Sequence, residues 1–482
     1  MLNIRVESIR NWFNKHSSLI AGITLGCLTL IGGVLRAYHI GFKSLWYDEA
    51  VVYWISKSNL SSLVGINAQL NSAPPLYVFL IHFVSQISSN EATLRSISWL
   101  AGTLSIPLIY FLALRYVSKS AAFATVIIFV VTPVYIEYSQ QLREYSLAFL
   151  LSVLMFLVYN EFKKKGSWSS LALLVATFLV GLILQYGLAL LILSFNLAFI
   201  IEVEWCHNKV VLLKWVTGQV AILLAVAWIW VSTLHFQYSL GGFSYLANGY
   251  FKGSLPSLPA FLYRQTYDIV LFAFPDPPLV ILLMGTGLIG VLAYRSSLRK
   301  YANLVIPFIV AAVAGILSIY PYLGARQAIY LFPIICIFIA MGFDYILRVD
   351  KKGIVAVLLV ILVVRAAFLS SVGYLRSEGI ENLKPLVQQL TTDLQAGDRI
   401  FICNGAIPAF RYYFRGDLGQ VVEGAPTEDW QKQFSAILDT SSRVWLVASH
   451  CGDVSTYVNF AARRRPIEEV GSKYQAWLYL SP

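Results

Sequence analysis

Charged residues are scarce in this chain of 482 amino acids. They make up 13% of the residues, against 58% hydrophobic ones, and the mean hydropathy is +0.68. Soluble domains carry about a quarter charged residues, so the composition excludes an ordinary soluble protein and indicates one that crosses a membrane several times. The net charge of +11 does not indicate nucleic-acid binding, because the basic residues form short clusters between apolar runs.

Cysteine is also rare, and none of the five cysteines falls in a CxxC or Cys/His spacing that would hold a metal. Cys27, Cys206 and Cys336 fall in or beside apolar runs, so we interpret them as ordinary apolar residues. Cys403 and Cys451 both lie in the C-terminal region, and their spacing leaves open whether they form a disulfide. The chain lacks a Gly-rich phosphate loop of the Walker type, which argues against a nucleotide-driven reaction.

Long apolar runs are abundant. A membrane span takes about twenty largely apolar residues, and the first run lacks a small-residue cleavage site, so we expect a retained span and not a signal peptide. We predict eleven spans, over residues 19–38, 96–114, 121–137, 145–161, 169–184, 187–203, 211–234, 276–294, 302–320, 328–347 and 353–373.

Segment 74–87 is apolar but short, and it opens with two prolines. If it stays out of the membrane, the basic clusters between the spans fall on the side of the N-terminus, where Arg5, Arg10 and Lys15 lie. If it crosses, those clusters are exported, against the positive-inside rule. We therefore predict a cytoplasmic N-terminus and an extracytoplasmic juxtamembrane helix over 74–87.

This topology places several segments on one extracytoplasmic face, together with the chain from about residue 375 onward. The tail holds apolar stretches at Asp398–Cys403 and Arg443–Ala448 that predict short buried strands, and a helix is expected over 381–395. The five outer segments that precede the tail are 39–95, 138–144, 185–187, 235–275 and 321–327.

The predicted fold class is thus an all-α polytopic membrane domain followed by a small α/β domain. We expect the membrane domain over residues 1–374 and the extracytoplasmic α/β domain over 375–482, since about 105 residues suffice for one small domain.

Asp48 and Glu49 are adjacent carboxylates at the predicted outer boundary of the first span. A carboxylate at such a boundary can accept the proton of a sugar hydroxyl and make it a nucleophile, so we predict both residues as catalytic, with Asp48 as the base. A structural alternative is that Asp48 is the N-cap of a short helix over 49–57, with Trp46 and Tyr47 as interface anchors. A divalent metal ion held by the two acids is a further option.

Two arginines stand among aromatic residues at the outer boundary, where positive charge is scarce in this chain. Arg143 lies between Tyr138 and Tyr145, and Arg326 follows two other tyrosines. A guanidinium binds phosphate oxygens through paired charged hydrogen bonds, and tyrosine hydroxyls add neutral ones. We predict that these four residues bind a donor phosphate. The alternative is that the arginines end spans and reach lipid head groups.

Three further residues are candidates for a donor or acceptor pocket. Tyr77 follows a helix start fixed by Pro74 and Pro75, Tyr186 lies in the short break between two spans, and Arg264 lies in the loop 235–275.

The order of these elements resembles the GT-C glycosyltransferases, and the most similar branch is that of the protein O-mannosyltransferases and the lipid A aminoarabinose transferase. The resemblance covers roughly residues 30–330. It is carried, in order, by Leu35-Arg36, LWYDEA at 45–50, PPLYVFLIH at 74–82, LRSISWLAGTLSIPLIYFLALRYV at 94–117, TPVYIEYSQQLREYSL at 132–147 and Arg326.

The resemblance implies transfer of a sugar from a polyprenyl phosphate, with inversion, to a hydroxyl of a glycan, lipid or protein on the outer side of the plasma or inner membrane. It makes Asp48 the base or acceptor-binding group, with Glu49 as its partner, and places Arg143 near the donor phosphate. The chain departs from many relatives at Ala73, where they carry His or Lys, and at Gln141, where they carry an acid.

Other classes of protein compete with this interpretation. A transporter of polysaccharide or lipid-linked glycan needs polar residues near the middle of its spans, whereas the unusual charges here gather at one face. A ligase that moves a whole glycan from a diphosphate carrier is a related enzyme. A scaffold that binds cell-wall material through its tail would need the tail but not Asp48.

Overall fold

Two compact units make up the chain. The computed structural model describes residues 17–202, 209–239, 244–350, 353–427, 429–473 and 475–482. Arg5, Arg10, Lys15 and Cys206 lie outside the described residues. Unit 1 consists of Met1–Tyr38, Asn67–Tyr77 and Ser96–Leu375, and unit 2 of His39–Ile66, Val78–Arg95 and Arg376–Pro482.

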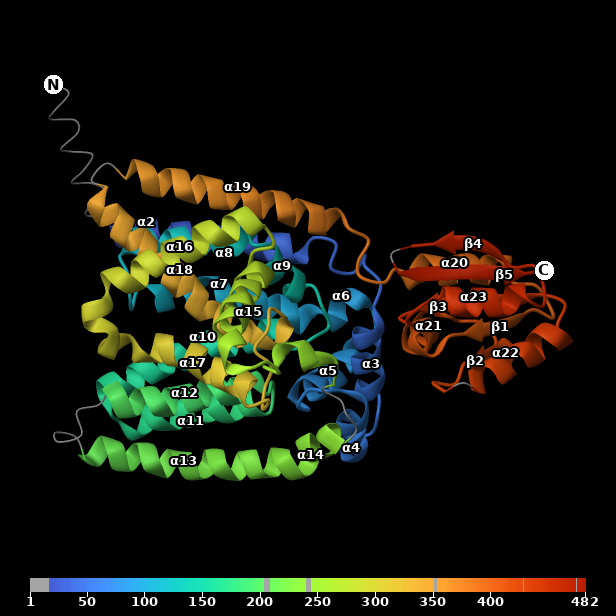
Figure 1. Cartoon of the computed structure of the whole chain (residues 1–482), viewed down its shortest axis with the longest axis horizontal. Coiled ribbons are helices and arrows are strands. Elements are labelled where there is room, and N and C mark those ends of the chain that lie inside the picture. The colour runs from blue at the N-terminus through green and yellow to red at the C-terminus, as the bar shows by residue number, and fades with distance from the viewer. Residues whose placement is uncertain (1–16, 203–208, 240–243, 351–352, 428, 474) are drawn as a thin grey trace, which may run out of the picture. The chain divides into compact units, whose positions relative to one another are not determined.

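Unit 1 is built from apolar helices joined by short connections (Figure 1). Its α-helices are α2 (Ser17–Ala37), α7 (Ser96–Ala113), α8 (Lys119–Val131), α9 (Pro133–Ser139), α10 (Tyr145–Lys165), α11 (Trp168–Leu182), α12 (Gly187–Glu202), α13 (Lys209–Ile229), α14 (His235–Ser239), α15 (Leu258–Ala273), α16 (Pro277–Ala293), α17 (Ala302–Ile316), α18 (Phe332–Val349) and α19 (Ile354–Arg376). Shorter turns are the π-helical η1 (Trp230–Leu234) and the 3₁₀ turns η2 (Ser244–Gly249), η3 (Leu255–Ser257), η4 (Arg295–Tyr301) and η5 (Arg326–Leu331).

All eleven predicted spans coincide with helices. Within the described residues, seven helical stretches are long and apolar enough to cross a membrane, and the bent pairs α8–α9 and α15–α16 raise the number to nine. The other two expected spans are the apolar helices α11 and α12, with 15 and 16 residues. The helical membrane fold is confirmed, and the count of eleven crossings stays a prediction. The helix expected over 74–87 is α5 (Leu76–Ile87), which belongs partly to each unit.

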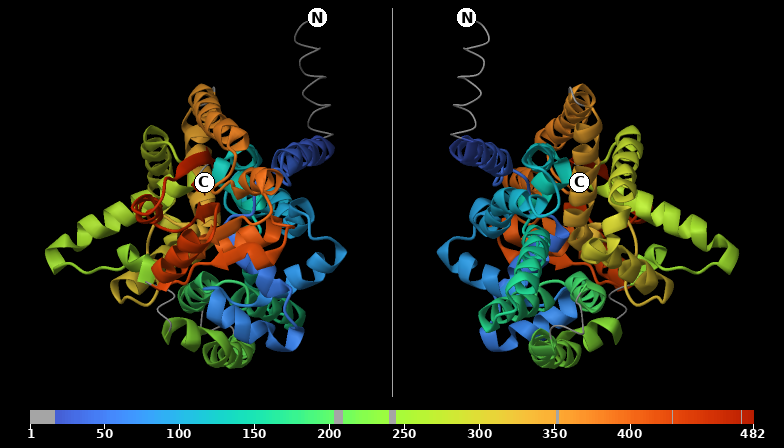
Figure 2. Two further views of the ribbon diagram at one scale, coloured as in Figure 1. Left: turned by 90° about the vertical axis from the view of Figure 1, so that its right-hand side faces the viewer. Right: turned by 90° about the vertical axis from the view of Figure 1, so that its left-hand side faces the viewer.

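Apolar side chains on the edge helices of unit 1 face away from the rest of the chain. α13 and α19 lie along opposite edges of this unit (Figures 1 and 2). Leu223 and Leu224 on α13 and Leu358 and Ile361 on α19 are exposed. Apolar surface of this extent needs a lipid environment, so the chain is an integral membrane protein.

A proline bends the helix that leads toward Arg143. Pro133 has no N–H to continue the helix, and Thr132 before it is extended, with φ −74° and ψ 127°. As a result α9 runs at 58° to α8. The predicted span 121–137 is therefore two helices, and the second of them, α9, continues past the span and carries Tyr138.

A polar junction and a close glycine contact hold other helices of unit 1 together. At the end of α12, the Glu202 carboxylate accepts hydrogen bonds from the Tyr159 hydroxyl and the Asn303 N–H, both at 2.9 Å, and joins α10 and α17. Elsewhere α16 packs on α18 through glycines, since a Cβ at Gly290 would lie 2.6 Å from the Gly342 nitrogen. Small residues of this kind let membrane helices approach closely.

Unit 2 combines the first loop with the C-terminal region. Its helices are α3 (Tyr47–Ser56), the first part of α4 (Leu60–Leu70), most of α5, α6 (Glu91–Leu94), α20 (Leu383–Asp393), α21 (Ile407–Tyr413), α22 (Asp429–Thr440) and α23 (Ser455–Ala462), with 3₁₀ turns η6 (Asn404–Ala406) and η7 (Leu418–Gln420). Unit 2 includes 39–66 and 78–95 as well as the chain from Arg376, and the division into domains 1–374 and 375–482 stays a prediction.

The C-terminal region forms a five-stranded sheet in the order β2-β1-β3-β5-β4. The strands are β1 (Arg399–Ile402), β2 (Val421–Glu423), β3 (Val444–Ser449), β4 (Glu468–Ser472) and β5 (Ala476–Ser481). β1 is parallel to β2 and β3, whereas β5 is antiparallel to β3 and β4. The two predicted strands are β1 and β3, and the predicted helix is α20, so the α/β character of the tail is confirmed. Phe401, Phe434 and Leu446 lie in its core.

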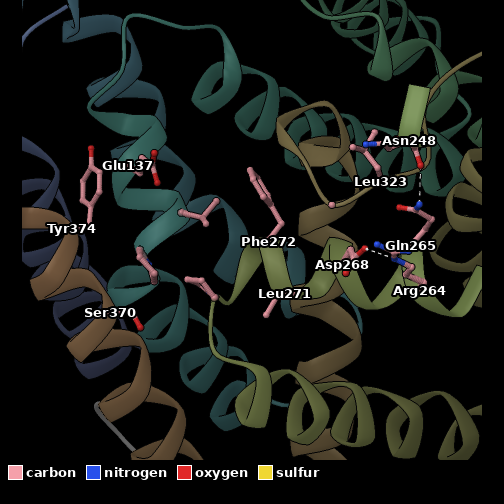
Figure 3. A pocket seen from close by; sticks show the side chains of 14 residues that line it. Glu137, Asn248, Arg264, Gln265, Asp268, Leu271, Phe272, Leu323, Ser370 and Tyr374 are labelled. Carbon is pink, nitrogen blue, oxygen red and sulfur yellow. Dashed lines mark hydrogen bonds and ion pairs between the residues drawn. The ribbon is translucent and has the colours of Figure 1, made fainter. Parts of the chain in front are cut away.

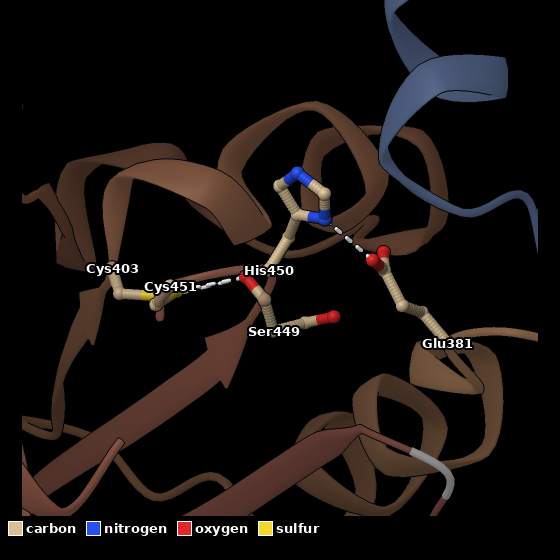
Figure 4. Close-up of a disulfide and its surroundings, with 5 residues drawn as sticks. All are labelled: Glu381, Cys403, Ser449, His450 and Cys451. Carbon is tan, nitrogen blue, oxygen red and sulfur yellow. Dashed lines mark hydrogen bonds and ion pairs between the residues drawn. A yellow bond between two sulfur atoms is a disulfide. The ribbon is translucent and has the colours of Figure 1, made fainter. Parts of the chain in front are cut away.

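Cys403 and Cys451 are joined by a disulfide within this region (Figure 4), with their Cα atoms 6.1 Å apart. Among the described cysteines, Cys27 on α2 is exposed and Cys336 on α18 is buried, and both are free.

Candidate active site

A cavity of about 670 Å³ in unit 1 gathers residues from distant parts of the sequence. Each of the five segments expected on the outer face contributes to its lining, represented by Ala73, Arg143, Tyr186, Tyr250 and Gln327. Hydropathy and charge alone were enough to group these segments on one face. Their convergence on one cavity supports that grouping.

The lining of the cavity combines polar groups with a larger apolar surface. Arg143, Glu144, Tyr145, Gln185 and Tyr186 bring the polar groups. The apolar lining from α11 to α13 and from the segment after α17 includes Leu182, Ala189, Leu190, Val226, Ile229, Trp230, Leu317 and Ile319. Such a surface fits a ligand with a charged head and a long hydrocarbon tail.

The Arg143 guanidinium is buried and contacts its two following neighbours. Its Nε lies 3.1 Å from Glu144 Oε2, and its Nη2 donates to Glu144 Oε1 and to the Tyr145 hydroxyl, both at 3.2 Å. The guanidinium carbon also lies 5.4 Å from the centre of the Tyr145 ring. These contacts fix a buried positive group at the wall of the cavity.

Arg326 approaches the same tyrosine. Its guanidinium carbon lies 5.6 Å from the centre of the Tyr145 ring. Tyr138 packs edge-on to Tyr145, with 5.0 Å between ring centres. The structure thus brings together all four residues that the sequence predicted as a phosphate-binding group: Arg143, Arg326, Tyr138 and Tyr145.

Tyr77 supports this cluster from outside the cavity lining. The Ser98 hydroxyl donates to the Arg143 carbonyl oxygen at 2.9 Å, and the Tyr77 hydroxyl lies 2.8 Å from the same Ser98 oxygen. Because the Ser98 hydrogen is used on the carbonyl, Tyr77 is the donor to Ser98. Tyr77 is fully buried, so it fixes the backbone of Arg143.

Tyr186 lines the cavity and is bound to the helix across from it. Its hydroxyl donates to Gln237 Oε1 at 2.7 Å, and Gln237 Nε2 donates to the carbonyl oxygens of Asn71 (2.6 Å) and Ala73 (3.2 Å). Burial raises the pKa of Tyr186 to about 12, although its bonds to Thr233 and Gln237 lower it, so the hydroxyl stays protonated.

The helix that carries Gln237 contains a π-helical turn, η1, just before it. An extra residue in a turn shifts the facing of the residues that follow, and π turns are frequent at functional sites. Here the turn brings Trp230 and Leu234 to the cavity wall. The π-helical turn also precedes Gln237, whose side chain binds the backbone of residues 71 and 73.

Arg264 lines a different cavity of unit 1, with a volume of about 800 Å³ (Figure 3). Its Nε lies 3.8 Å from Asp268 Oδ2, and the neighbouring Gln265 donates to the Asn248 carbonyl at 3.0 Å. Glu137 lies on the opposite wall in Figure 3 and accepts a hydrogen bond from Gln141 at 3.0 Å. The structure therefore does not place Arg264 and Tyr186 in one pocket.

In unit 2, Asp48 lies in the first turn of α3, which begins at Tyr47. Trp46 takes the cap position with extended backbone, at φ −85° and ψ 176°. The alternative that Asp48 caps a helix over 49–57 is therefore wrong, because the helix begins before Asp48.

Glu49, the second acid of the pair, is fully buried against Arg95. Arg95 donates from Nη2 to Glu49 Oε2 at 2.6 Å and from Nε to Oε1 at 2.9 Å. Oε2 also accepts the Trp46 N–H at 3.4 Å. Because both carboxylate oxygens are engaged, the contacts favour Glu49 as the residue that fixes the start of α3, next to Asp48.

No group of three or more His, Cys, Asp or Glu side chains suited to a metal ion occurs in the part of the chain that the structure describes.

Three residues of these arrangements were not singled out from the sequence. Arg95 belongs to the LRSISW motif, and a lone arginine at the start of a span is the signal that could have found it. Gln185 and Gln237 are amides in otherwise apolar surroundings, which is a weaker signal. The Gln185 side-chain oxygen is buried and has no hydrogen-bond donor among the described residues.

Comparison with known proteins places these features in context. Residues 72–230, about a third of the chain, match the family model described as dolichyl-phosphate-mannose-protein mannosyltransferase. No curated protein matches the chain in sequence at a significant level.

Solved structures are similar over nearly the whole length. ArnT from Cupriavidus metallidurans in the apo state has a TM-score of 0.59 at 15% identity, covering 96% of this chain and 98% of that one. ArnT bound to undecaprenyl phosphate has a TM-score of 0.56 at 14% identity, covering 95% and 97%. The archaeal oligosaccharyltransferase AglB from Archaeoglobus fulgidus, in complex with an inhibitory peptide and a dolichol-phosphate, has a TM-score of 0.52 at 12% identity, covering 90% and 70%. At these identities the similarity concerns the fold.

Proposed function

We propose, on the premise that this chain has the GT-C glycosyltransferase fold, that it transfers a sugar from a polyprenyl phosphate to a hydroxyl acceptor. The acceptor hydroxyl belongs to a glycan, a lipid or a protein, and the reaction takes place on the extracytoplasmic side of the membrane. The disulfide between Cys403 and Cys451 supports export of the C-terminal region, since such bonds persist in oxidising compartments.

One observation carries the proposal: the cavity of about 670 Å³ combines an apolar surface with the buried Arg143. A polyprenyl chain fits the apolar surface, and its phosphate needs the cation. Together Arg143, Arg326 and Glu144 carry a formal charge of +1, which complements the single negative charge of a sugar phosphodiester. Bidentate contacts from a guanidinium are the strong form of phosphate binding.

The residue at position 73 is consistent with phosphate binding by Arg143 and Arg326. It lines the cavity at the position where many relatives carry His or Lys, so the chain lacks one cation there. Arg143 and Arg326, which share the Tyr145 ring, supply positive charge instead. Gln185 offers a buried amide oxygen to a hydroxyl of the sugar.

The chemistry is a single displacement with inversion at the anomeric carbon. The acceptor oxygen forms a bond to that carbon while the bond from carbon to the phosphate oxygen breaks, and the electron pair leaves with the polyprenyl phosphate. The acceptor proton passes to the Asp48 carboxylate. The leaving phosphate gains a second negative charge, so the arginines bind it more tightly in the transition state than in the donor, which is what lowers the barrier.

The test uses purified full-length protein in lipid nanodiscs with a panel of undecaprenyl-phosphate hexoses and pentoses. Release of undecaprenyl phosphate by the wild-type protein is the expected result, and no release with any donor would refute the proposed function. Asp48→Asn should lower the rate by a factor of about 100 or more with the fold intact. A near wild-type rate in this variant would remove Asp48 as the base.

Donor binding is tested separately with undecaprenyl phosphate as the probe. Loss of the charged hydrogen bonds in Arg143→Ala should weaken binding by a factor of roughly 10 to 100. Arg115→Ala is a matched control, because Arg115 is a half-exposed arginine of the same unit that pairs with Glu161 at 3.6 Å. Equal affinity of the two variants would contradict the role of Arg143.

A further inference from the structure

The backbone just before Asp48 is bound at three successive N–H groups. The Leu45 N–H donates to the Tyr413 hydroxyl at 2.6 Å, and the Trp46 N–H donates to Glu49 at 3.4 Å. The Tyr47 N–H donates to Glu381 Oε2 at 3.0 Å. Two of the three acceptors come from the C-terminal region, so that region helps to fix where α3 begins.

Glu381 and His450 hold Tyr47 from two directions. Glu381 is buried, and its second oxygen, Oε1, accepts a hydrogen bond from His450 Nδ1 at 2.7 Å (Figure 4). The His450 ring in turn stacks on the Tyr47 ring, with 4.3 Å between centres and 2° between planes. One carboxylate thus binds both the backbone of Tyr47 and the ring that covers its side chain.

The backbone fixes the position of His450. The residue follows β3 and precedes Cys451, whose disulfide partner is Cys403 after β1. Its φ of 56° lies in the left-handed region that residues other than glycine rarely adopt. Such a conformation persists only where the surroundings hold it, and here these are the strand end and the disulfide.

We infer that Glu381 and His450 are positioning residues for the sugar transfer. They hold Tyr47, and through it the first turn of α3, so that the Asp48 carboxylate keeps one orientation. This inference rests on the proposed function, because it assumes that Asp48 takes the acceptor proton. It gives the C-terminal α/β region a part in the reaction. Misplacement of a reacting group by about 1 Å can cost a factor of 100 in rate.

The first experiment measures hydrogen exchange of the peptide that contains Leu45–Asp48, in the full-length protein in nanodiscs. Glu381→Ala should exchange the amide of Tyr47 about ten times faster than the wild-type protein. Glu381→Gln should restore most of the protection, because the amide oxygen still accepts the Tyr47 N–H. Glu423→Ala is the matched control: it removes a carboxylate of the same sheet region that binds Arg411. Unchanged exchange in Glu381→Ala would overturn the inference.

The second experiment compares turnover with binding in the same variants. Glu381→Ala should lower kcat by a factor of roughly 10 to 100 while the affinity for undecaprenyl phosphate changes by less than about twofold. If Glu381→Ala melts below the control, His450→Ala provides the same test, since its side chain is 44% exposed.

The outcomes separate this inference from the proposed function. Faster exchange with an unchanged kcat would overturn the positioning role and leave the sugar transfer standing. No turnover by the wild-type protein would overturn the proposed function and the positioning role with it.

Discussion

Glu49→Ala should destabilise unit 2, although its neighbour Asp48 tolerates substitution. The change removes the buried carboxylate that pairs with the Arg95 guanidinium at 2.6 Å. Breaking one side of a buried ion pair typically costs about 3 to 5 kcal/mol. Substitution of Glu49 should therefore lower the stability of unit 2, whereas substitution of Asp48 should lower the catalytic rate.

The structure places the cost at the lower end of that range. After the change, Arg95 keeps three backbone acceptors, the carbonyl oxygens of Ile40, Lys43 and Ser44, at 2.8, 2.9 and 3.0 Å. The charge stays partly solvated, so we expect a loss of about 3 kcal/mol. For a unit of this size, the melting temperature should fall by roughly 6 to 12 °C.

The assay is thermal unfolding of the purified protein in detergent, followed by tryptophan fluorescence. Asp48→Asn is the control and should melt within about 3 °C of the wild-type protein, because Asp48 is only half-buried. If Glu49→Ala melts with the control, the ion pair does not stabilise unit 2. If Asp48→Asn loses as much stability as Glu49→Ala, the division of roles between the two acids is wrong.

Three other changes test separate parts of the structure. Cys403→Ser opens a disulfide that spans 48 residues, and the lost restraint on the unfolded chain should cost up to about 4 kcal/mol, measured by melting against the oxidised wild-type protein; equal melting temperatures would contradict a stabilising bond. Arg264→Ala should leave undecaprenyl phosphate binding unchanged, because Arg264 lines the other cavity; weaker lipid binding would contradict that separation. Gly290→Leu should force α16 away from α18 and cost roughly 1 to 3 kcal/mol in detergent melting, and an unchanged melting temperature would show that the helices do not need this close approach.

Hydropathy was sufficient to predict the helices, because a membrane span is specified by composition over about twenty residues. Hydropathy was not sufficient to predict where a helix is interrupted within an apolar run. Pro133 lies inside the run predicted as one span over 121–137, and the structure bends there by 58°. A single proline changes the direction of a helix without changing its mean hydropathy, so the break was missed.

The four residues predicted to bind phosphate could be grouped from the sequence because they share a position at the ends of predicted spans, and their role stays a prediction. Arg143 and Arg326 are far apart in sequence, but both follow the end of a predicted span, and the fold brings them to the same ring. The residues that contact Glu49 and Tyr47 do not share a position that the sequence reveals. Arg95 lies 46 residues from Glu49, and Glu381 lies 334 residues from Tyr47. Pairing over such distances is decided by tertiary packing and not by local pattern.

The segmented composition of unit 2 has a consequence for biosynthesis. Residues 39–66 and 78–95 leave the ribosome early, but about 280 residues must be translated before their partners after Arg376 begin to emerge. At roughly 5 to 20 residues per second this interval is on the order of 15 to 60 s. During that time the amide groups around Tyr47 have no acceptors from Tyr413 or Glu381. A nascent chain with its membrane helices inserted would thus still lack the finished start of α3, and the region after Arg376 would complete the first loop.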